Sequence, residues 1–162
     1  MSIPSKVLSH LTTSKVPHEV VTHKKVFTAY DLAQTMREKL QNIAKTLLVK
    51  VDKEYKIIVI PAHYRLDLGK LKKILKVKAL RIAKEGEMAK RLKVKPGALS
   101  PFGTLYKVGV VVDASLLKVQ KAIFQAGSFT ESLRMKVKDF MELEHPIVGH
   151  FVTKPVPQKK RS

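Results

Sequence analysis

Two apolar runs, Ile43 to Val51 and Tyr55 to Pro61, constrain the fold of this chain most, because only the polar residues Asp52-Lys53-Glu54 separate them. Runs of this length that are rich in β-branched residues and bounded by a polar turn are typical of strands. Two such strands joined by so short a turn form a β-hairpin. The chain is therefore predicted to contain a sheet, and the hairpin is its central part.

One charged residue, Lys45, interrupts the first of these runs. In a strand, side chains alternate between two faces, so Lys45 shares a face with Ile43, Leu47 and Val49, while Ala44, Thr46 and Leu48 lie on the other. Burying an unpaired ammonium costs several kcal/mol. Lys45 must therefore reach solvent along its aliphatic stem, pair with a carboxylate, or line a cavity. The pattern alone favours the first of these.

The remaining segments alternate irregularly between helical and strand patterns. Thr28 and Asp67 are suited to cap two of the helices, because their side-chain oxygens accept a backbone N–H of the first turn. The predicted class is α/β (α+β), with a mixed, curled sheet that forms a partly closed barrel flanked by helices. The predicted helices span residues 3–13, 29–39, 67–76, 85–92 and 138–144, and the further strands span residues 18–22, 79–83, 108–112, 121–124 and 133–137.

The length of 162 residues suits one compact domain, which we place at residues 1–150. Residues 151–162 contain Pro155, Pro157 and the cluster Lys159-Lys160-Arg161, and are predicted to be an extended basic tail. Neither a long apolar run for a membrane span nor the apolar core of a signal peptide is present, so we expect a cytoplasmic protein.

The charge balance indicates a polyanionic partner. The chain has 32 Lys and Arg residues against 13 Asp and Glu, for a formal net charge of +19. Lysine enrichment also accompanies thermostability, but the matching gain in glutamate is missing here. A nucleic acid held through its phosphates fits this balance best. The absence of cysteine excludes disulfides, thiolate metal sites and a cysteine nucleophile.

A loop with two glycines and a proline, Gly97-Ala98-Leu99-Ser100-Pro101-Phe102-Gly103, is the second candidate for a site. Glycine permits backbone conformations that turn several N–H groups toward one point, where they can hold a carbonyl oxygen or a phosphate. The simpler interpretation is an ordinary tight turn. Three histidines, His63, His145 and His150, are scattered without the spacing of a metal site, so neither a metal nor a cofactor is expected.

These segments, in this order, resemble the YbaK/ProX family of aminoacyl-tRNA editing domains. The resemblance covers nearly the whole chain and is carried most specifically by Ala44-Lys45-Thr46 followed by the Gly97-x-x-x-Pro101 loop. The resemblance implies that Lys45 is the essential pocket residue and that the loop seats the aminoacyl ester, with Ser100 adding a hydroxyl. It also implies that Phe27, Thr28, Tyr30, Thr46 and Gly127 border the substrate. Ser128 and Phe129 depart from the family pattern, which leaves the choice of substrate open.

The resemblance implies a deacylase that hydrolyses the ester of mischarged tRNA in trans, and the aminoacylated 3′ end of tRNA as partner, with a synthetase as a possible second one. No serine lies in a Gly-x-Ser-x-Gly elbow, which disfavours a covalent hydrolase. Two alternatives stay open: an inactive RNA-binding or regulatory domain of the same fold, and an esterase for small molecules, which the net charge disfavours. The oligomeric state is not predicted.

Overall fold

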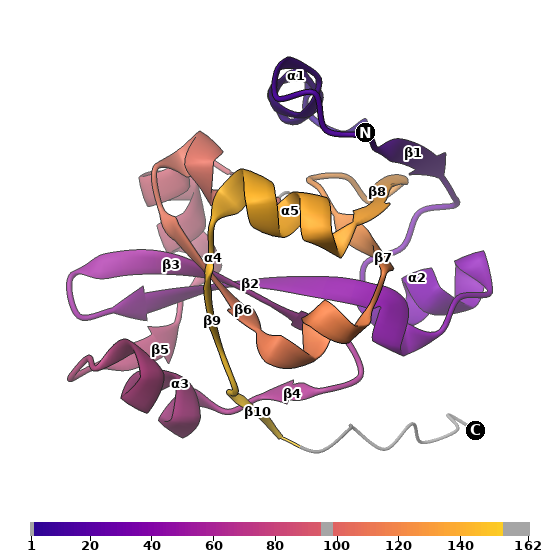
Figure 1. Cartoon of the computed structure of the whole chain (residues 1–162). Coiled ribbons are helices and arrows are strands. Elements are labelled where there is room, and N and C mark those ends of the chain that lie inside the picture. Colours follow the sequence, from indigo (N-terminus) through magenta and orange to yellow (C-terminus); the bar gives the residue numbers. More distant parts are fainter. Residues whose placement is uncertain (1, 95–98, 154–162) are drawn as a thin grey trace.

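The computed structural model describes residues 2–94 and 99–153, and Figure 1 shows their arrangement. The helices are α1 (Ser5–Thr13), α2 (Ala29–Met36), α3 (Leu68–Leu75), α4 (Glu85–Glu87) and α5 (Val137–Glu144), with short 3-10 or π turns η1 (Leu40–Asn42), η2 (Met88–Leu92), η3 (Gly103–Tyr106) and η4 (Ala114–Lys118). The strands are β1 (Glu19–Thr22), β2 (Ile43–Val51), β3 (Glu54–Pro61), β4 (Arg65–Leu66), β5 (Leu80–Ile82), β6 (Gly109–Asp113), β7 (Lys121–Gln125), β8 (Glu131–Lys136), β9 (Ile147–Gly149) and β10 (Val152–Thr153).

The predicted hairpin is confirmed and forms the centre of the main sheet. Antiparallel pairing joins β2 to β3 from Ala44, opposite Pro61, to Val51, opposite Glu54. The eight strands follow the order β1-β8-β7-β2-β3-β6-β9, with β5 on β2, and the pairs β2–β7, β3–β6 and β6–β9 are parallel. The mixed sheet flanked by helices is therefore as predicted. Within residues 2–94 and 99–153, the end strands β1 and β9 do not pair, so this sheet is not a closed barrel.

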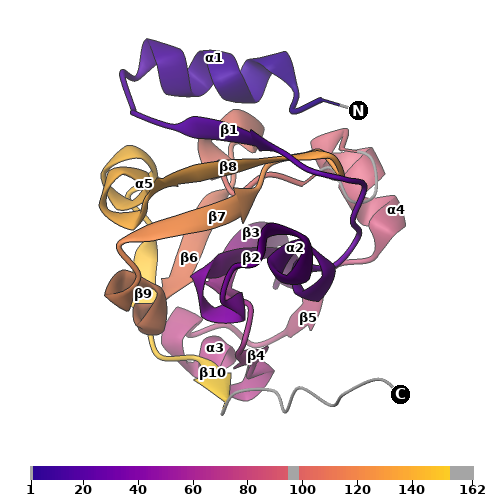
Figure 2. The ribbon, with the colours of Figure 1, turned by 90° about the vertical axis from the view of Figure 1, so that its right-hand side faces the viewer.

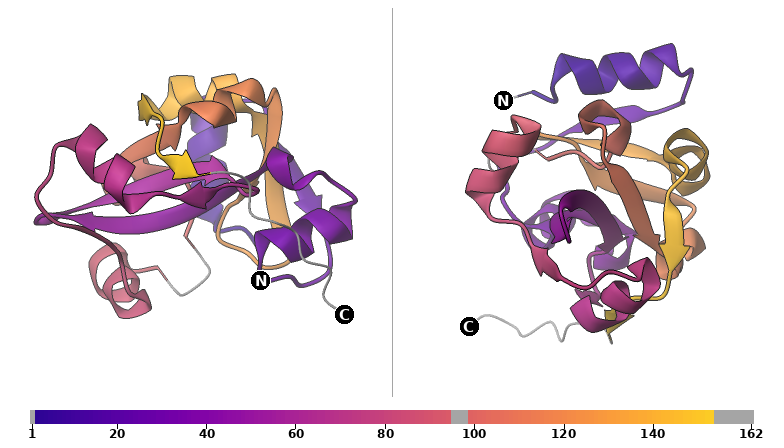
Figure 3. Two further views of the ribbon diagram at one scale, coloured as in Figure 1. Left: turned by 90° about the horizontal axis from the view of Figure 1, so that it is seen from below. Right: turned by 90° about the vertical axis from the view of Figure 1, so that its left-hand side faces the viewer.

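Two layers of helices cover the two faces of the sheet, as the alternation along β2 requires. Ala44 and Leu48 belong to the largest hydrophobic cluster, which includes residues of α1 and α5. On the other face, Ile43 packs with α2, whereas Val49 and Val51 pack with α3. Figure 2 shows α1 and α3 on opposite sides of the sheet. The view from below in Figure 3 shows α2 and α3 toward the two ends of the hairpin.

Both predicted helix caps are present. The Thr28 hydroxyl accepts a hydrogen bond from the Asp31 N–H at 3.0 Å, and the Asp67 carboxylate accepts one from the Lys70 N–H at 3.0 Å. The helix predicted over residues 29–39 ends at Met36, because Arg37 adopts a left-handed conformation with φ 54°. That conformation stops the helical hydrogen-bond pattern and directs the chain into η1 and β2.

The fold continues into the segment that the sequence assigned to the basic tail. Phe151 is fully buried, and its N–H donates to the Asp113 carboxylate at 2.7 Å. Val152 and Thr153 pair with Leu66 and Arg65 as the small β10–β4 sheet. Residues 154–162 lie outside the described residues, so the prediction of a tail there remains a prediction. In the part of the chain described, no helix is both long and apolar enough to cross a bilayer.

Candidate functional site

The candidate site lies where the main sheet divides along one edge of β2. On that edge, β7 pairs with β2 at Ile43 and Ala44, and β5 pairs with it from Val49 to Val51. The opposite edge is fully paired with β3. Between the two short pairings, the Ala83 N–H donates to the Leu48 carbonyl at 2.9 Å. Among the described residues, no strand covers the stretch from Lys45 to Leu48 on this edge, and we call this gap the split.

Lys45 is an exposed residue within an otherwise largely buried strand. It has the predicted position on the face of Ile43 and Val49, both of which are fully buried. Ile43 packs under α2 and Val49 under α3, so Lys45 lies between the parts of the sheet that the two helices cover. No residue described in the structure gives Lys45 an ion pair, and the lysine thus carries an uncompensated positive charge.

Thr46, the next residue, points to the opposite face. Its Oγ1 atom is buried and has no hydrogen-bond partner among the described residues. An unsatisfied buried hydroxyl is unusual and costs roughly 1 to 3 kcal/mol. On this face lies the largest hydrophobic cluster, which we call the inner cluster. Two of its alanines lie on the two sides of the split: Ala83 follows β5, and Ala126 follows β7. The site therefore presents two adjacent polar groups, on opposite faces of β2, that the fold itself does not use.

The turn after β7 borders the split at its β7 end. Gly127 is buried and has φ 94°, a conformation that strongly favours glycine. The turn is held by the Ser128 hydroxyl, which accepts the N–H groups of Thr130 and Glu131, each at 3.1 Å. The Gly127 conformation explains why this residue is needed for the backbone, whether or not it also contacts a ligand.

The segment before α2 runs along this turn, and three more predicted site residues lie on that segment or on the first turn of α2. The Val26 N–H donates to the Phe129 carbonyl at 2.9 Å, and the Phe27 and Phe129 rings lie 4.9 Å apart. Phe27 is 63% exposed, unusual for a ring of this size. Thr28 caps α2, and the Tyr30 hydroxyl accepts a hydrogen bond from Gln34 at 2.7 Å. Phe27 thus lies at the turn that follows β7, and Thr28 and Tyr30 lie at the start of α2, the helix that packs on Ile43 at the start of β2.

The glycine-proline loop is only partly described, and Gly97 lies outside the described residues. Ser100 and Pro101 are buried. The Ser100 hydroxyl is 2.8 Å from the Tyr106 hydroxyl, which also accepts the Ser100 N–H at 3.2 Å. Leu99 and Phe102 pack in the inner cluster with Ala44 and Leu48, on the face of β2 that carries Thr46. The role of Ser100 toward a substrate therefore stays a prediction, and its visible role is to anchor the loop.

His63 was considered from the sequence only as a metal ligand. It lies two residues after β3 and lines a cleft of about 510 Å³ together with Tyr30. Its Nδ1 atom is buried without a partner in the described structure, and burial lowers the pKa of the imidazole. Extending the hairpin register beyond Pro61, which faces Ala44, would have placed His63 beside the residues before Ile43. No group of three His, Asp or Glu side chains in residues 2–94 and 99–153 is arranged to hold a metal ion.

The fold is an α/β domain with the split at the centre of its mixed sheet, and the comparisons with known proteins place it more narrowly. The model of the aminoacyl-tRNA editing domain matches residues 23–143. The chain therefore belongs to the aminoacyl-tRNA editing domain family, and within it to the YbaK/ProX type related to prolyl-tRNA synthetase editing domains. The resemblance expected from the sequence is confirmed.

Curated relatives and solved structures agree with this assignment. The chain is 29% identical over 93 residues to the proline--tRNA ligase of Staphylococcus aureus (strain Newman), and 30% identical over 91 residues to that of Macrococcus caseolyticus (strain JCSC5402). The matches cover 57% and 56% of this chain but only 16% of each ligase.

Two solved structures show the same fold. The hypothetical protein APE2540 has a TM-score of 0.84 at 21% identity, over 91% of this chain and 99% of that one. A protein described as a "putative trans-editing enzyme for prolyl tRNA synthetase" has a TM-score of 0.81 at 22% identity, over 92% and 96%.

Proposed function

We propose that this protein is a trans-editing aminoacyl-tRNA deacylase, which hydrolyses the ester bond of mischarged tRNA. The observation that carries the proposal is the pair of unpartnered polar groups at the split, the Lys45 ammonium and the buried Thr46 hydroxyl. Family membership supplies the substrate class, and the net charge of +19 suits a polyanion such as tRNA. The name of the similar structure supports action in trans.

The proposed mechanism is positioning rather than covalent catalysis. Lys45 supplies a fixed positive charge to the aminoacyl ester or to the terminal phosphate, and backbone amides of the Gly97–Pro101 loop polarise the carbonyl toward the oxyanion. Water, or a group of the substrate itself, attacks the carbonyl carbon. The ester bond to the ribose then breaks, and the ribose oxygen leaves with a proton. Phe27, Thr28 and Tyr30 border the amino acid, and Gly127 closes the opposite side.

The experiment is a deacylation assay on a panel of tRNAs charged with cysteine, alanine, serine or threonine. The wild-type protein is expected to hydrolyse at least one of them in single-turnover reactions. Lys50→Ala is the matched control for Lys45→Ala, because both lysines belong to β2 and Lys50 lies outside the split, beside the turn and paired with Tyr55 and Arg81. Equal rates for the wild type and Lys45→Ala would contradict the proposal. Unchanged activity in a chelator is expected, and zinc-dependent recovery would contradict it.

The loop is tested by comparing two substitutions. Gly97→Ala places a methyl group where the substrate is proposed to bind, and a lost oxyanion contact costs roughly 10²- to 10³-fold in rate. Pro101→Ala loosens the loop and is expected to cost less. Affinity for uncharged tRNA is expected to change little in both. If Pro101→Ala lost most of the deacylation rate and Gly97→Ala kept it, the loop would act through its rigidity and not through an oxyanion contact.

The second candidate function is an inactive RNA-binding or regulatory domain, which the charge balance of the chain favours on its own. In this case tRNA affinity would still fall steeply with salt, and duplex DNA would bind comparably, because released counterions dominate both. The deacylation panel separates the two functions. Salt-dependent tRNA binding without hydrolysis of any charged tRNA would favour the second.

A further inference from the structure

The cleft beside His63 lies next to the proposed ester site but is not used by the proposed chemistry. It has a volume of about 510 Å³, within the range of ligand sites, and lies between α2, η1 and the end of β3. A second cleft of about 350 Å³ adjoins it, with Gln41 and His63 in the lining of both. Tyr30, which borders the proposed substrate, also lines the first cleft.

The lining has the composition of a site for an unpaired nucleotide. Tyr30 and His63 provide rings, Gln34 and Gln41 provide amides, and Arg37 and Lys39 provide positive charge. Single-stranded RNA is recognised by rings that stack on bases, by amides that hydrogen-bond to base edges, and by cations on phosphates. The acidic residue of the lining, Glu38, is already occupied by the Asn42 amide at 2.8 Å and the Lys39 N–H at 3.1 Å.

His63 has one ring atom that the fold itself leaves unpaired. Its Nδ1 is buried and has no partner in the part of the chain that the structure describes, so one hydrogen-bonding group remains to be satisfied. Burial lowers the pKa of His63, which keeps the ring neutral at pH 7. A neutral imidazole suits a base edge better than a phosphate. The ring also lies against Tyr64, with the centroids 3.9 Å apart, which fixes its orientation.

The cleft is connected to Lys45 through the core. Ala33, in the cleft lining, packs in one cluster with Ile43 and with Ala62, the neighbour of His63. Ile43 lies on the same face of β2 as Lys45, two residues before it. A nucleotide in the cleft would therefore lie close to an ester held at Lys45. In tRNA, the nucleotides that precede the aminoacylated ribose are unpaired.

We propose that the cleft between α2 and His63 binds an unpaired nucleotide of the tRNA acceptor end, with its base against Tyr30 and His63 and its phosphate on Arg37. Gln41 hydrogen-bonds to the edge of the base. The inference rests on the proposed function, because the choice of tRNA as the ligand comes from that function. It adds a specific contact to the non-specific attraction of the lysine-rich surface.

The test compares two RNA hairpins that copy an acceptor stem, one with its unpaired 3′ end and one trimmed to a blunt end, both with free 3′ hydroxyls. The wild-type protein is expected to bind the first roughly tenfold more tightly. Gln41→Ala, at an exposed position, and His63→Gln, which keeps a polar group, are expected to remove most of this preference without weakening the blunt hairpin. Thermal unfolding of both variants verifies that they are folded.

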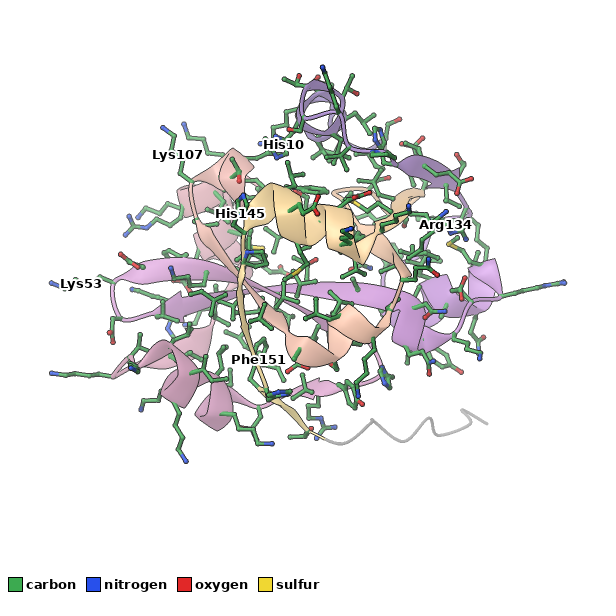
Figure 4. All side chains as sticks on the ribbon, viewed as in Figure 1. His10, Lys53, Lys107, Arg134, His145 and Phe151 are labelled. Carbon is green, nitrogen blue, oxygen red and sulfur yellow. The ribbon has the colours of Figure 1, made fainter. Side chains whose placement is uncertain are left out.

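Arg37→Ala is expected to lower the slope of log affinity against log salt by about one for the hairpin with the 3′ end. Lys53→Ala is its control. This substitution also removes one positive charge, but at the turn between β2 and β3, as Figure 4 shows. A wild-type protein without the preference, or both cleft variants with an intact preference, would overturn the inference. This assay measures binding and needs no hydrolysis. A protein that deacylates tRNA but does not prefer the hairpin with the unpaired 3′ end would contradict this inference and leave the proposed function standing. A protein that shows this preference but hydrolyses no charged tRNA would contradict only the proposed function.

Discussion

The two ends of β2 differ in their surroundings: beside one end the polar side chains of the neighbouring elements are paired, and at the other end the polar atoms of β2 itself are not. Near its C-terminal end, Lys50 pairs with Tyr55 on β3 and Arg81 on β5, and both of these side chains bind Glu87. The Glu87 carboxylate accepts the Arg81 guanidinium at 2.5 and 2.9 Å, the Tyr55 hydroxyl at 2.5 Å and the Lys84 N–H at 3.0 Å. Near its N-terminal end, the polar atoms of Lys45 and Thr46 have no such partners among the described residues.

The difference separates polar groups that serve the fold from those available to a ligand. A saturated cluster has no capacity left for a substrate, and its removal is expected to affect stability alone. Unpartnered groups stabilise nothing in the free protein, so their removal is expected to affect binding or catalysis without lowering the stability. Substitutions near the two ends of β2 therefore test whether this difference holds.

Lys45→Ala is expected to have the largest effect, a loss of roughly 10²- to 10³-fold in the single-turnover deacylation rate. Because Lys45 is exposed and unpaired in the described structure, the free energy of unfolding is expected to change by no more than about 0.5 kcal/mol. Urea denaturation and deacylation together check both statements. Lys45→Arg is also expected to be impaired, since a planar guanidinium aims its donors differently. A Lys45→Ala protein that is destabilised but still active would show that Lys45 serves the fold and not the substrate.

Gly103→Ala tests a part of the glycine-proline loop where the demand is structural. A Cβ at this position would lie 2.4 Å from the Val108 carbonyl oxygen and 2.6 Å from Val110 Cγ2. The expected loss is about 1 to 3 kcal/mol in the free energy of unfolding. Gly86→Ala is the control, because its Cβ meets nothing within 4 Å. Equal unfolding midpoints for the two variants would show that the loop can move aside.

Thr46→Val separates function from stability at the split itself. Valine has nearly the shape of threonine but lacks the buried, unpartnered hydroxyl, so the free energy of unfolding is expected to rise by about 1 kcal/mol. The deacylation rate is expected to fall roughly tenfold if that hydroxyl contacts the substrate. Thr46→Ser, which keeps the hydroxyl, is expected to retain most of the rate. A Val variant that is less stable than the wild type would mean that the hydroxyl serves the fold.

The sequence was sufficient for the elements whose signals are local. The alternation along residues 43–51 predicted the exact bounds of β2 and the faces of Lys45 and Thr46, and the caps at Thr28 and Asp67 followed from single residues. The short strands β4, β9 and β10 were not predicted, since two or three residues carry no periodicity. Their pairing depends on contacts between distant segments, such as the one that buries Phe151.

The site was predictable in part, for a similar reason. Family resemblance selected Lys45 and its neighbours, but the split arises from the pairing of β2 with both β7 and β5, which no local pattern encodes. His63 was dismissed from the sequence because it lacks the spacing of a metal ligand. Its unpartnered Nδ1 becomes visible only when the strand register brings it to the cleft.

Glu87→Gln is expected to have the smallest effect and tests the saturated end of β2. The Arg81 guanidinium first of all, with the Lys84 N–H and the Tyr55 hydroxyl, holds the pKa of Glu87 well below its usual range. A carboxyl whose pKa is lowered on folding contributes stability above its unfolded pKa, and this contribution is lost as pH falls toward the folded pKa. The Tm of Glu87→Gln is therefore expected to lie below that of the wild type at pH 7, and the gap is expected to narrow as pH falls below about 4. Because the group lies near the surface, the gap is expected to shrink in high salt as well. Deacylation at pH 7 is expected to be unchanged, and a loss of rate without a loss of Tm would show that both ends of β2 serve the substrate.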